Sequence, residues 1–334
     1  MNEITKVALD AMGGDNAPKE MVKGALEAIN SNEELKVYLV GQEARIKAEL
    51  EGISFDKSRL EIVHATEVIE TAEPPANAIR NKKDSSIVVG LKLVKDGTCD
   101  AFVSAGSTGA VLVGAIGIVR TIKGIKRPAL APFLPTEKGV SLLIDCGANV
   151  DARPGELLQF AKMGSIYYEN TIGKEKPTVG IVNIGAEEDK GNALVKETFP
   201  LLKACDTINF IGSCEARDIP SGYCDVMVTE AFVGNVVLKM FEGVGKTLIS
   251  ELKKGIMSSI RSKLAGVLLK PALKKTLAKY DANAYGGAPM LGLNGLVVKT
   301  HGSSKALEVK NTLEQCITFN KAKINQKIAE STNL

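Results

Sequence analysis

The sequence contains no tryptophan, and aromatic side chains make up only 4% of its 334 residues. Proteins that bind single-stranded nucleic acids commonly stack the bases on aromatic rings, so the composition argues against that class. The total charge adds no support for a polyanionic partner, because 42 lysines and arginines against 39 acidic residues leave a net charge of only +3. We therefore expect no nucleic-acid partner.

Histidines are scarce and paired cysteines are missing. The chain has two histidines, His64 and His301, and none of its six cysteines belongs to a CxxC pair. Zinc sites usually combine such residues at short spacings, so we expect no metal site. Scattered single cysteines are typical of the reduced thiols of a cytoplasmic protein.

One stretch without charges, residues 101–119, approaches the length of a membrane-spanning helix. Its first half, AFVSAGSTGA, is rich in serine, threonine and glycine, which predicts a strand, a turn and the start of a buried helix instead. The first residues, MNEITKVALD, include Glu3 and lack a long apolar run, so no signal peptide is expected. These features predict a cytoplasmic protein.

The sequence does contain a regular alternation of apolar runs and helical patterns. KVALD is followed by a helical pattern over residues 18–29, whose predicted apolar face consists of Met21, Val22, Ala25, Leu26 and Ile29. Similar strand-like runs follow along the chain: KVYLVG, LEIVHA, DAFVSA, GVSLLID, PTVGIVNI, TINFIG and CDVMVTE. This order predicts an α/β fold with a doubly wound, mostly parallel sheet.

No repeat or linker marks a domain boundary, so one α/β body over residues 1–330 is expected. The exception is the segment 239–281, which has a helical pattern without a strand-like run. It predicts a helical excursion from the body, before the strand-and-turn stretch YGGAPMLGLNGLVV.

Four strand-like runs end in turns rich in glycine and polar residues. Ligands of open α/β sheets bind beyond the carboxyl ends of the strands, where backbone amides of such turns can approach an anion. Hydroxyls, amides and one lysine at a common edge suit an oxyanion such as phosphate. The candidates are Asp10, Gly13, Gly14 and Asp15; Ser104, Gly106, Ser107 and Thr108; Asp145 and Asn149; and Asn183, Lys190 and Asn192.

Several well-known catalytic and nucleotide-binding motifs are incomplete or absent in this sequence. Gly245, Lys246 and Thr247 resemble the end of a P-loop, but Met240 stands where its first glycine is required. Ser107 lacks the first glycine of GxSxG, and no strand is followed by GxGxxG, so neither a serine triad nor a dinucleotide site is indicated. The acidic run at residues 187–189 is typical of a solvated turn. His64 suits a structural role, whereas His301, in the polar turn KTHGSSK, is a candidate working residue.

The segment from Lys253 to Lys279 is strongly basic, with eight lysines and arginines and no acidic residue. Apolar residues at helical spacing run through it, and Pro271 is expected to interrupt the helix. Such a helix suits an anionic membrane surface or an acidic protein, and a dimer-packing helix with a solvated basic face is the alternative. The candidate contact residues are Arg261, Leu264, Val267, Leu268, Lys270, Lys274 and Lys275.

A set of motifs in a fixed order covers almost the whole chain: ALDAMGGDNAP, SAGSTGA, RPALAPFLPT, DCGANVDARP, NIGAEEDKGN, NFIGSCEARD, FVGNVVLK, YGGAPMLGL and HGSS. With these motifs the chain resembles the PlsX family of phosphate acyltransferases. The resemblance implies a fold of the isocitrate dehydrogenase and phosphotransacetylase type. It also implies transfer of a fatty acyl group from acyl carrier protein (ACP) to inorganic phosphate, early in phospholipid synthesis, by a homodimer associated peripherally with membranes and followed by a glycerol-3-phosphate acyltransferase.

Applied to this chain, the resemblance implies a non-covalent mechanism without a cofactor, in which bound phosphate attacks the thioester. Lys190 is expected to supply charge to the phosphate. Asn183 and Asn235 are expected to donate hydrogen bonds to the thioester oxyanion, and His301 to assist the departing thiolate.

Two motifs depart from the family pattern. Ser107 replaces the asparagine of SAGNTGA, and Glu230, Ala231 and Phe232 replace a DGF turn, which puts the placement of Asn235 in question if that turn needs the positive φ of glycine. A coenzyme A-dependent phosphotransacetylase, a metal-dependent decarboxylating dehydrogenase and a membrane-bound scaffold without activity remain the alternatives.

Overall fold

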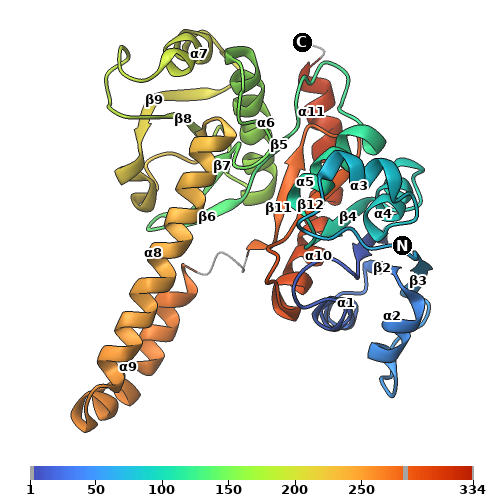
Figure 1. Cartoon of the computed structure of the whole chain (residues 1–334). Coiled ribbons are helices and arrows are strands. Elements are labelled where there is room, and N and C mark those ends of the chain that lie inside the picture. Colours follow the sequence, from blue (N-terminus) through green and yellow to red (C-terminus); the bar gives the residue numbers. More distant parts are fainter. Residues whose placement is uncertain (1–3, 281–284, 333–334) are drawn as a thin grey trace. The chain divides into compact units, whose positions relative to one another are not determined.

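The computed structural model describes residues 4–280 and 285–332. The chain forms two compact units, each with its own sheet (Figure 1). Unit 1 consists of residues 1–132, 162–176 and 283–334, and unit 2 of residues 133–161 and 177–282. The sequence predicted one body over 1–330, and whether the two units act as one catalytic domain stays a prediction.

Unit 1 contains a sheet of seven strands in the order β3-β2-β1-β4-β12-β11-β5. Its parallel part consists of β1 (Thr5–Asp10), β2 (Leu35–Gly41), β3 (Leu60–His64), β4 (Ala101–Ser104) and β12 (Leu296–Lys299). Two short antiparallel strands, β11 (Ala288–Leu291) and β5 (Ala129–Leu130), complete one edge. The central strands are buried, in keeping with helices on both faces.

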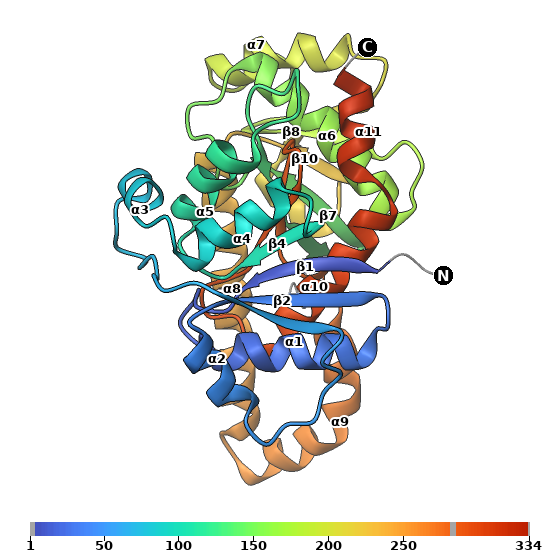
Figure 2. The same ribbon diagram turned by 90° about the vertical axis from the view of Figure 1, so that its right-hand side faces the viewer.

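The helices of unit 1 form two groups, on opposite sides of the sheet in Figure 2. One group contains α1 (Lys19–Ser31) and α10 (Ala306–Lys321), in contact where Gly24 leaves room for Val309. The other contains α3 (Pro75–Asn81), α4 (Ser86–Lys95) and α5 (Thr108–Gly114), the last continued by a π-helical turn over Ala115–Val119. The predicted apolar face of α1 is buried, and residues 101–119 form the predicted strand, turn and helix.

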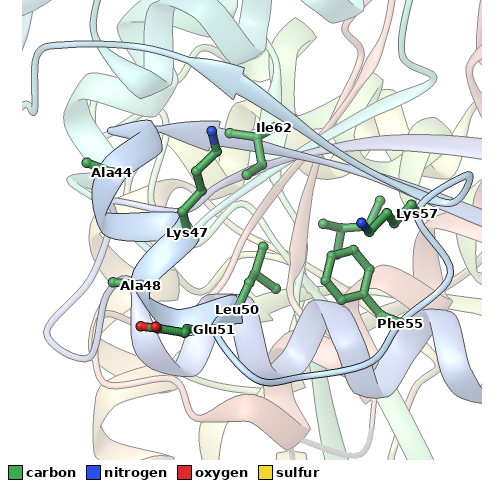
Figure 3. Close-up of a pocket in the computed structure, with 9 residues that line it drawn as sticks. Ala44, Lys47, Ala48, Leu50, Glu51, Phe55, Lys57 and Ile62 are labelled. Carbon is green, nitrogen blue, oxygen red and sulfur yellow. The ribbon is translucent and has the colours of Figure 1, made fainter.

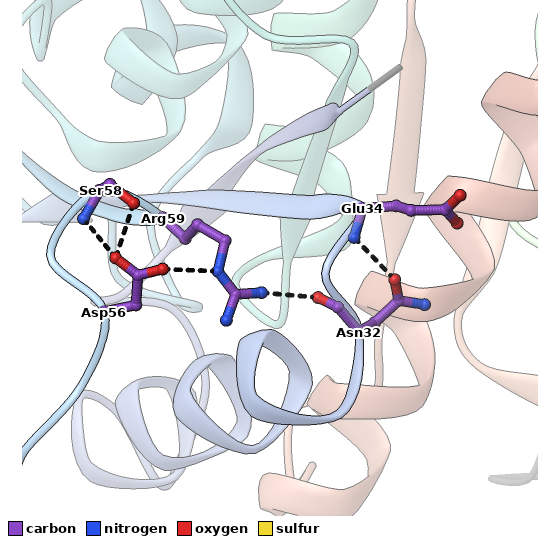
Figure 4. A network of polar contacts seen from close by, with 5 residues as sticks. All are labelled: Asn32, Glu34, Asp56, Ser58 and Arg59. Carbon is purple, nitrogen blue, oxygen red and sulfur yellow. Dashed lines mark hydrogen bonds and ion pairs between the residues drawn. The ribbon is translucent and has the colours of Figure 1, made fainter. Parts of the chain in front are cut away.

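A short polar network fixes the loop between α2 (Glu43–Leu50) and β3 (Figure 4). Arg59 donates to the carboxylate of Asp56 at 3.0 Å and to the carbonyl of Asn32, beyond the end of α1, at 2.9 Å. Ser58 also donates to Asp56, and these hydrogen bonds lower the pKa of that carboxyl to about 2. The network ties the entry of edge strand β3 to the helix beside it.

Unit 2 contains five strands in the order β6-β7-β10-β8-β9. The parallel strands are β7 (Gly139–Ile144), β10 (Val226–Val228), β8 (Thr178–Asn183) and β9 (Asn209–Glu215), with β6 (Phe133–Thr136) antiparallel at one edge. Helix α7 (Ala193–Lys203) follows β8, and a 3-10 turn over Ala216–Ser221 follows β9. Helix α6 (Pro154–Ile172) begins in unit 2 and ends in unit 1, where α11 (Ile324–Thr332) also lies.

Two long helices of unit 2, α8 (Ala231–Met257) and α9 (Ile260–Ala278), run side by side away from its sheet (Figure 1). The expected excursion began at Lys239, but α8 begins eight residues earlier because Glu230 caps it. The excursion was also expected to reach Asp281, which lies outside the described residues. Pro271 was expected to interrupt the second helix, but it lies within α9, whose exposed surface lets water bond the carbonyl that proline leaves free.

None of the helices in residues 4–280 and 285–332 is both long and apolar enough to cross a membrane.

Candidate functional site

Three loops of unit 1 meet beyond the carboxyl ends of β1, β4 and β12. The amide of Asp15 donates to the carbonyl of Gly302 at 2.8 Å, and that of Thr300 to the carbonyl of Ser104 at 3.0 Å. Gly14 has φ +96°, and a Cβ there would lie 2.9 Å from the Gly302 oxygen. The sequence therefore needs glycine at this position to let the loops approach backbone to backbone.

Asp10 and Ser104 connect the first two loops below their surface. Both are fully buried, and the Ser104 hydroxyl donates to Asp10 at 2.7 Å while it accepts the amide of Gly106 at 3.0 Å. The amides of Met12 and Gly13 also donate to Asp10, whose pKa is nonetheless raised because burial disfavours its charge. These groups position the loops, and their direct contact with phosphate stays a prediction.

At the start of α5 the two predicted hydroxyls differ in their surroundings. Ser107 is buried, and its oxygen accepts the amide of Ala110 at 3.4 Å as the N-cap of the helix. Thr108 is exposed and carries the hydroxyl that faces water. The replacement of asparagine by Ser107 thus keeps a residue type that caps helices well.

The loop after β12 contains polar groups that sequence reasoning missed. Lys299 is only 8% exposed, pairs with Ser104 in the sheet register, and donates to the carbonyl of Thr300. Burial lowers the pKa of Lys299 to about 8, an effect that the nearby carboxylates of Asp10 and Asp15 partly offset. The sequence signal that could have identified Lys299 is its position at the end of an apolar strand, directly before a polar turn.

Unpaired hydroxyls lie beside Lys299. Among the described residues, six buried side-chain polar atoms lack a hydrogen-bond partner, and two of them, Thr300 Oγ1 and Ser304 Oγ, belong to this loop. A buried hydroxyl without a partner costs free energy, so such a pair within five residues favours a site that a polar ligand completes.

His301 lies exposed in the same loop. The hydroxyl of Ser303 is 2.7 Å from its Nδ1, and the backbone amide of Ser303 donates to Nδ1 at 3.2 Å. Because Nδ1 accepts that amide, the neutral ring carries its proton on Nε2. The Nε2–H is therefore the donor that the neutral ring offers.

Unit 2 contains a second group of candidate residues, around the loop after β7. The carboxylate of Asp145 accepts the amides of Gly147 at 3.1 Å and Asn149 at 2.8 Å, and also the side chain of Asn149 at 2.8 Å. Asn235, in the second turn of α8, donates to the carbonyl of Cys146 at 3.1 Å. This loop and the start of α8 thus form one hydrogen-bonded assembly, whose role in substrate binding stays a prediction.

The altered turn before α8 keeps its geometry. Ala231 does not adopt a positive φ but forms the first residue of α8, and its amide donates to the Asn149 carbonyl at 2.9 Å. Glu230 accepts the amide of Val233 at 3.1 Å as the N-cap, a role that the shorter aspartate usually fills. The concern that this position needs glycine is therefore removed for this chain.

The loop after β8 contains the remaining candidates. The side-chain amide of Asn183 donates to Ser213 Oγ at 3.0 Å and to the carbonyl of Lys190 at 3.3 Å. Asn192 caps α7 by accepting the amide of Val195 at 2.9 Å. The ammonium of Lys190 has no partner among the described residues and lies exposed to solvent. The candidate residues predicted from the sequence thus fall into two groups, one in each unit.

Two cavities lie in separate parts of the chain. A cavity of about 630 Å³ in unit 1 lies between α2 and β3, lined by Leu50, Phe55 and Ile62 with Lys47 and Lys57 beside them (Figure 3). It includes no residue of the three loops. A second cavity, of about 470 Å³, lies in unit 2 next to Asn183 and Asn192. Within the described residues, no three His, Cys, Asp or Glu side chains gather in a metal-binding arrangement.

Comparison with known proteins identifies the family of the chain. Residues 5–327 match the family model described as "Fatty acid synthesis protein". The chain is 48% identical to the phosphate acyltransferase of Clostridium tetani over 325 residues, which cover 97% of each chain. It is also 48% identical to the phosphate acyltransferase of Clostridium novyi, again over 97% of each chain.

Solved structures of phosphotransacetylases have the same fold. The enzyme from Streptococcus pyogenes matches 95% of this chain and 94% of its own with a TM-score of 0.62 and 17% identity. EutD phosphotransacetylase from Staphylococcus aureus matches 96% and 95%, with a TM-score of 0.59 and 17% identity. The chain therefore belongs to the fatty acid synthesis protein family, the PlsX family that its motifs resemble, and is an enzyme of the acyltransferase class.

Proposed function

We propose that the enzyme transfers a fatty acyl group from ACP to inorganic phosphate, giving acyl phosphate for phospholipid synthesis. The observation that carries this proposal is the loop after β12, where the buried ammonium of Lys299 lies in sequence beside the unpaired hydroxyls of Thr300 and Ser304. Cationic and hydroxyl donors suit a phosphate oxyanion, and hydrogen bonds to a charged group are about twice as strong as neutral ones.

In the proposed reaction, one phosphate oxygen attacks the carbonyl carbon of the thioester and forms a C–O bond. The C–S bond then breaks, and the carrier thiolate leaves and takes up a proton. Phosphate is already a nucleophile, so the protein chiefly has to hold it in place, and no covalent enzyme intermediate is needed. We assign the Nε2–H of His301 to donate to phosphate or to the departing sulfur, since Nδ1 already accepts the amide of Ser303.

Lys190 is assigned to the phosphate, and the side-chain amides of Asn183 and Asn235 are assigned to the acyl thioester. The exposed ammonium of Lys190 has no partner of its own, which suits it to a substrate. Asn235 donates one hydrogen bond to the protein, and a side-chain amide has two N–H groups, so it keeps a donor for the oxyanion. Asn183 already donates two, so it would serve the oxyanion by giving up the longer one, at 3.3 Å to the Lys190 carbonyl. Removal of such a donor commonly costs about 3 kcal/mol of transition-state stabilisation.

The α8–α9 hairpin is proposed to bind partners. Ser262, Gly266, Leu273 and Leu277 are the half-buried positions of α9, and Gly266 contacts Ile256 of α8. The opposite side of α9 exposes the apolar row Ile260, Leu264, Val267 and Leu268. Arg261, Lys270, Lys274 and Lys275 lie on both sides of this row at helical spacing. This pattern suits an anionic membrane surface or the acidic carrier, whereas exposed Met240 and Leu248 of α8 suit a second copy of the chain.

The test is to incubate the full chain with palmitoyl-ACP and phosphate and to trap acyl phosphate with hydroxylamine. Acetyl-CoA and palmitoyl-CoA are run in parallel. Phosphate-dependent hydroxamate from the carrier substrate supports the proposal. Turnover of acetyl-CoA in preference to the carrier substrate would point to a phosphotransacetylase, and no turnover of any thioester would refute the proposed reaction.

A further inference from the structure

The cavity of about 470 Å³ in unit 2 has a lining that differs from the polar loops around it. It lies beyond the carboxyl ends of β8 and β10 and is bounded by α6, α7 and α8. Its walls are mainly aliphatic and include Leu157, Ile181, Leu194, Val195, Val233 and Val237. Ligand cavities in proteins commonly have volumes of roughly 300–1,000 Å³ and walls of this kind.

Three polar side chains of the lining already form hydrogen bonds within the protein. Glu230 is its one charged residue, and the carboxylate accepts backbone amides as the cap of α8. The side-chain oxygen of Asn192 accepts the amide of Val195, and that of Asn183 accepts the amide of Ile184. A charged or strongly polar ligand would therefore find few groups to pair with inside the cavity.

The rim also favours an apolar occupant. Ile184 lines the cavity and is 81% exposed, although it directly follows a buried strand. Val233 and Val237 are one helical turn apart, so they present a continuous apolar surface along α8. Burying such side chains against a hydrocarbon chain is favourable by about 25 cal/mol for each Å² removed from water.

We propose that this cavity receives the hydrocarbon chain of the acyl substrate. The inference rests on the proposed function, because it assigns a binding site to the fatty acyl group of that reaction. Asn183 lies at the boundary between the apolar walls and the loop of Lys190, so the carbonyl end of the chain belongs at this side. The size of the cavity would then limit the length of the acyl chain that fits.

The proposal is tested with a substitution that reduces the volume of the cavity. Val237→Phe adds an aromatic ring at the lining, and Val236→Phe adds the same ring at the neighbouring residue, which is 54% exposed and does not line the cavity. The measured quantity is kcat/KM for acyl-ACP substrates with 8, 12 and 16 carbons. Val237→Phe is expected to lower the ratio of the 16-carbon to the 8-carbon value by about tenfold or more, while Val236→Phe leaves it unchanged.

Two further measurements keep the outcome clear. Leu194→Ala, which enlarges the cavity, should shift the preference toward longer chains even if Val237→Phe does not fold. Binding of the fluorescent fatty acid cis-parinaric acid is measured without turnover and should be lost in Val237→Phe. An unchanged length profile in both cavity variants of an active enzyme would overturn the inference. Fatty-acid binding that is sensitive to Val237→Phe, in an enzyme that turns over no thioester, would support the cavity and refute the proposed function.

Discussion

At the scale of single residues, Lys299 makes the stability of unit 1 depend on pH. Its pKa is lowered by burial from 10.5 to about 8, so between these values the folded chain binds fewer protons than the unfolded chain. Below about pH 8 the buried charge of Lys299 destabilises the folded chain by a constant amount. This cost decreases as the pH rises from about 8 toward 10.5, so the free energy of unfolding increases over that range.

To test this, the free energies of unfolding of the wild type and of Lys299→Met are measured by chemical unfolding at pH 7.5 and pH 10. Relative to the variant, the wild type should gain about 2–3 kcal/mol over this interval, because all other groups are shared. The variant should also have a raised KM for phosphate. A stability difference that does not change with pH would show that Lys299 has an ordinary pKa.

Lys190 and Asn235 allow turnover to be separated from stability. Lys190→Ala should lower kcat by 10-fold or more with no change in Tm, because its exposed ammonium has no partner in the described part of the chain. Asn235→Ala should lower kcat by about 100-fold and also cost about 1 kcal/mol of stability, since its hydrogen bond to Cys146 is lost. Full activity in both variants would exclude these residues from the reaction.

Sequence reasoning at this scale selected loops at the carboxyl ends of strands but could not foresee the local contacts of each side chain. Ser107 and Asn192 were selected as ligands, yet both cap helices, because the short polar residues that bind anions are also those that satisfy free backbone amides. Lys299 was missed, since its burial depends on the register of β12 beside β4, which pattern alone does not give.

At the scale of elements, periodicity predicted the long helices and buried strands better than their ends. The strands β5 and β6 were not predicted, because they are short and have prolines in or beside them, as edge strands allow. The start of α8 was misplaced because glutamate is a rare cap. Pro271 was overestimated as a helix breaker because exposure of α9 to water reduces the cost of its missing hydrogen bond.

The basic helix α9 leads to a prediction at the same scale. Reversal of two charges, with Lys274→Glu and Lys275→Glu, should weaken binding to phosphatidylglycerol vesicles or to ACP by at least 10-fold at low salt, because each basic residue near an anionic surface contributes about 1 kcal/mol. Vesicle flotation and titration calorimetry with ACP measure the two partners separately.

The matched control is Lys19→Glu with Lys23→Glu, which reverses the same charge at two exposed positions of α1 in unit 1. Equal losses in both variants would mean that net charge alone controls binding. No loss for α9 in either assay would leave its exposed apolar row to contacts between copies of the chain.

At the scale of the whole molecule, the α/β class and the helical hairpin were predictable, but the division into two units was not. Composition changes where a linker joins two domains, whereas here one crossing lies inside α6, between residues 161 and 162. A helix that belongs to both units has no break in its pattern. Only contacts between distant segments distinguish two sheets from one.

The order of the strands along the chain also determines when each unit can fold during synthesis. Every strand of unit 2 precedes residue 283, whereas β12, which lies between β4 and β11 in unit 1, leaves the ribosome after all of them. Unit 2 can therefore complete its sheet before the inner strand β12 of unit 1 has been synthesised. A message truncated after the α8–α9 hairpin would encode every strand of unit 2 but neither β11 nor β12, so its product would lack the loop of Lys299 to which we assign phosphate.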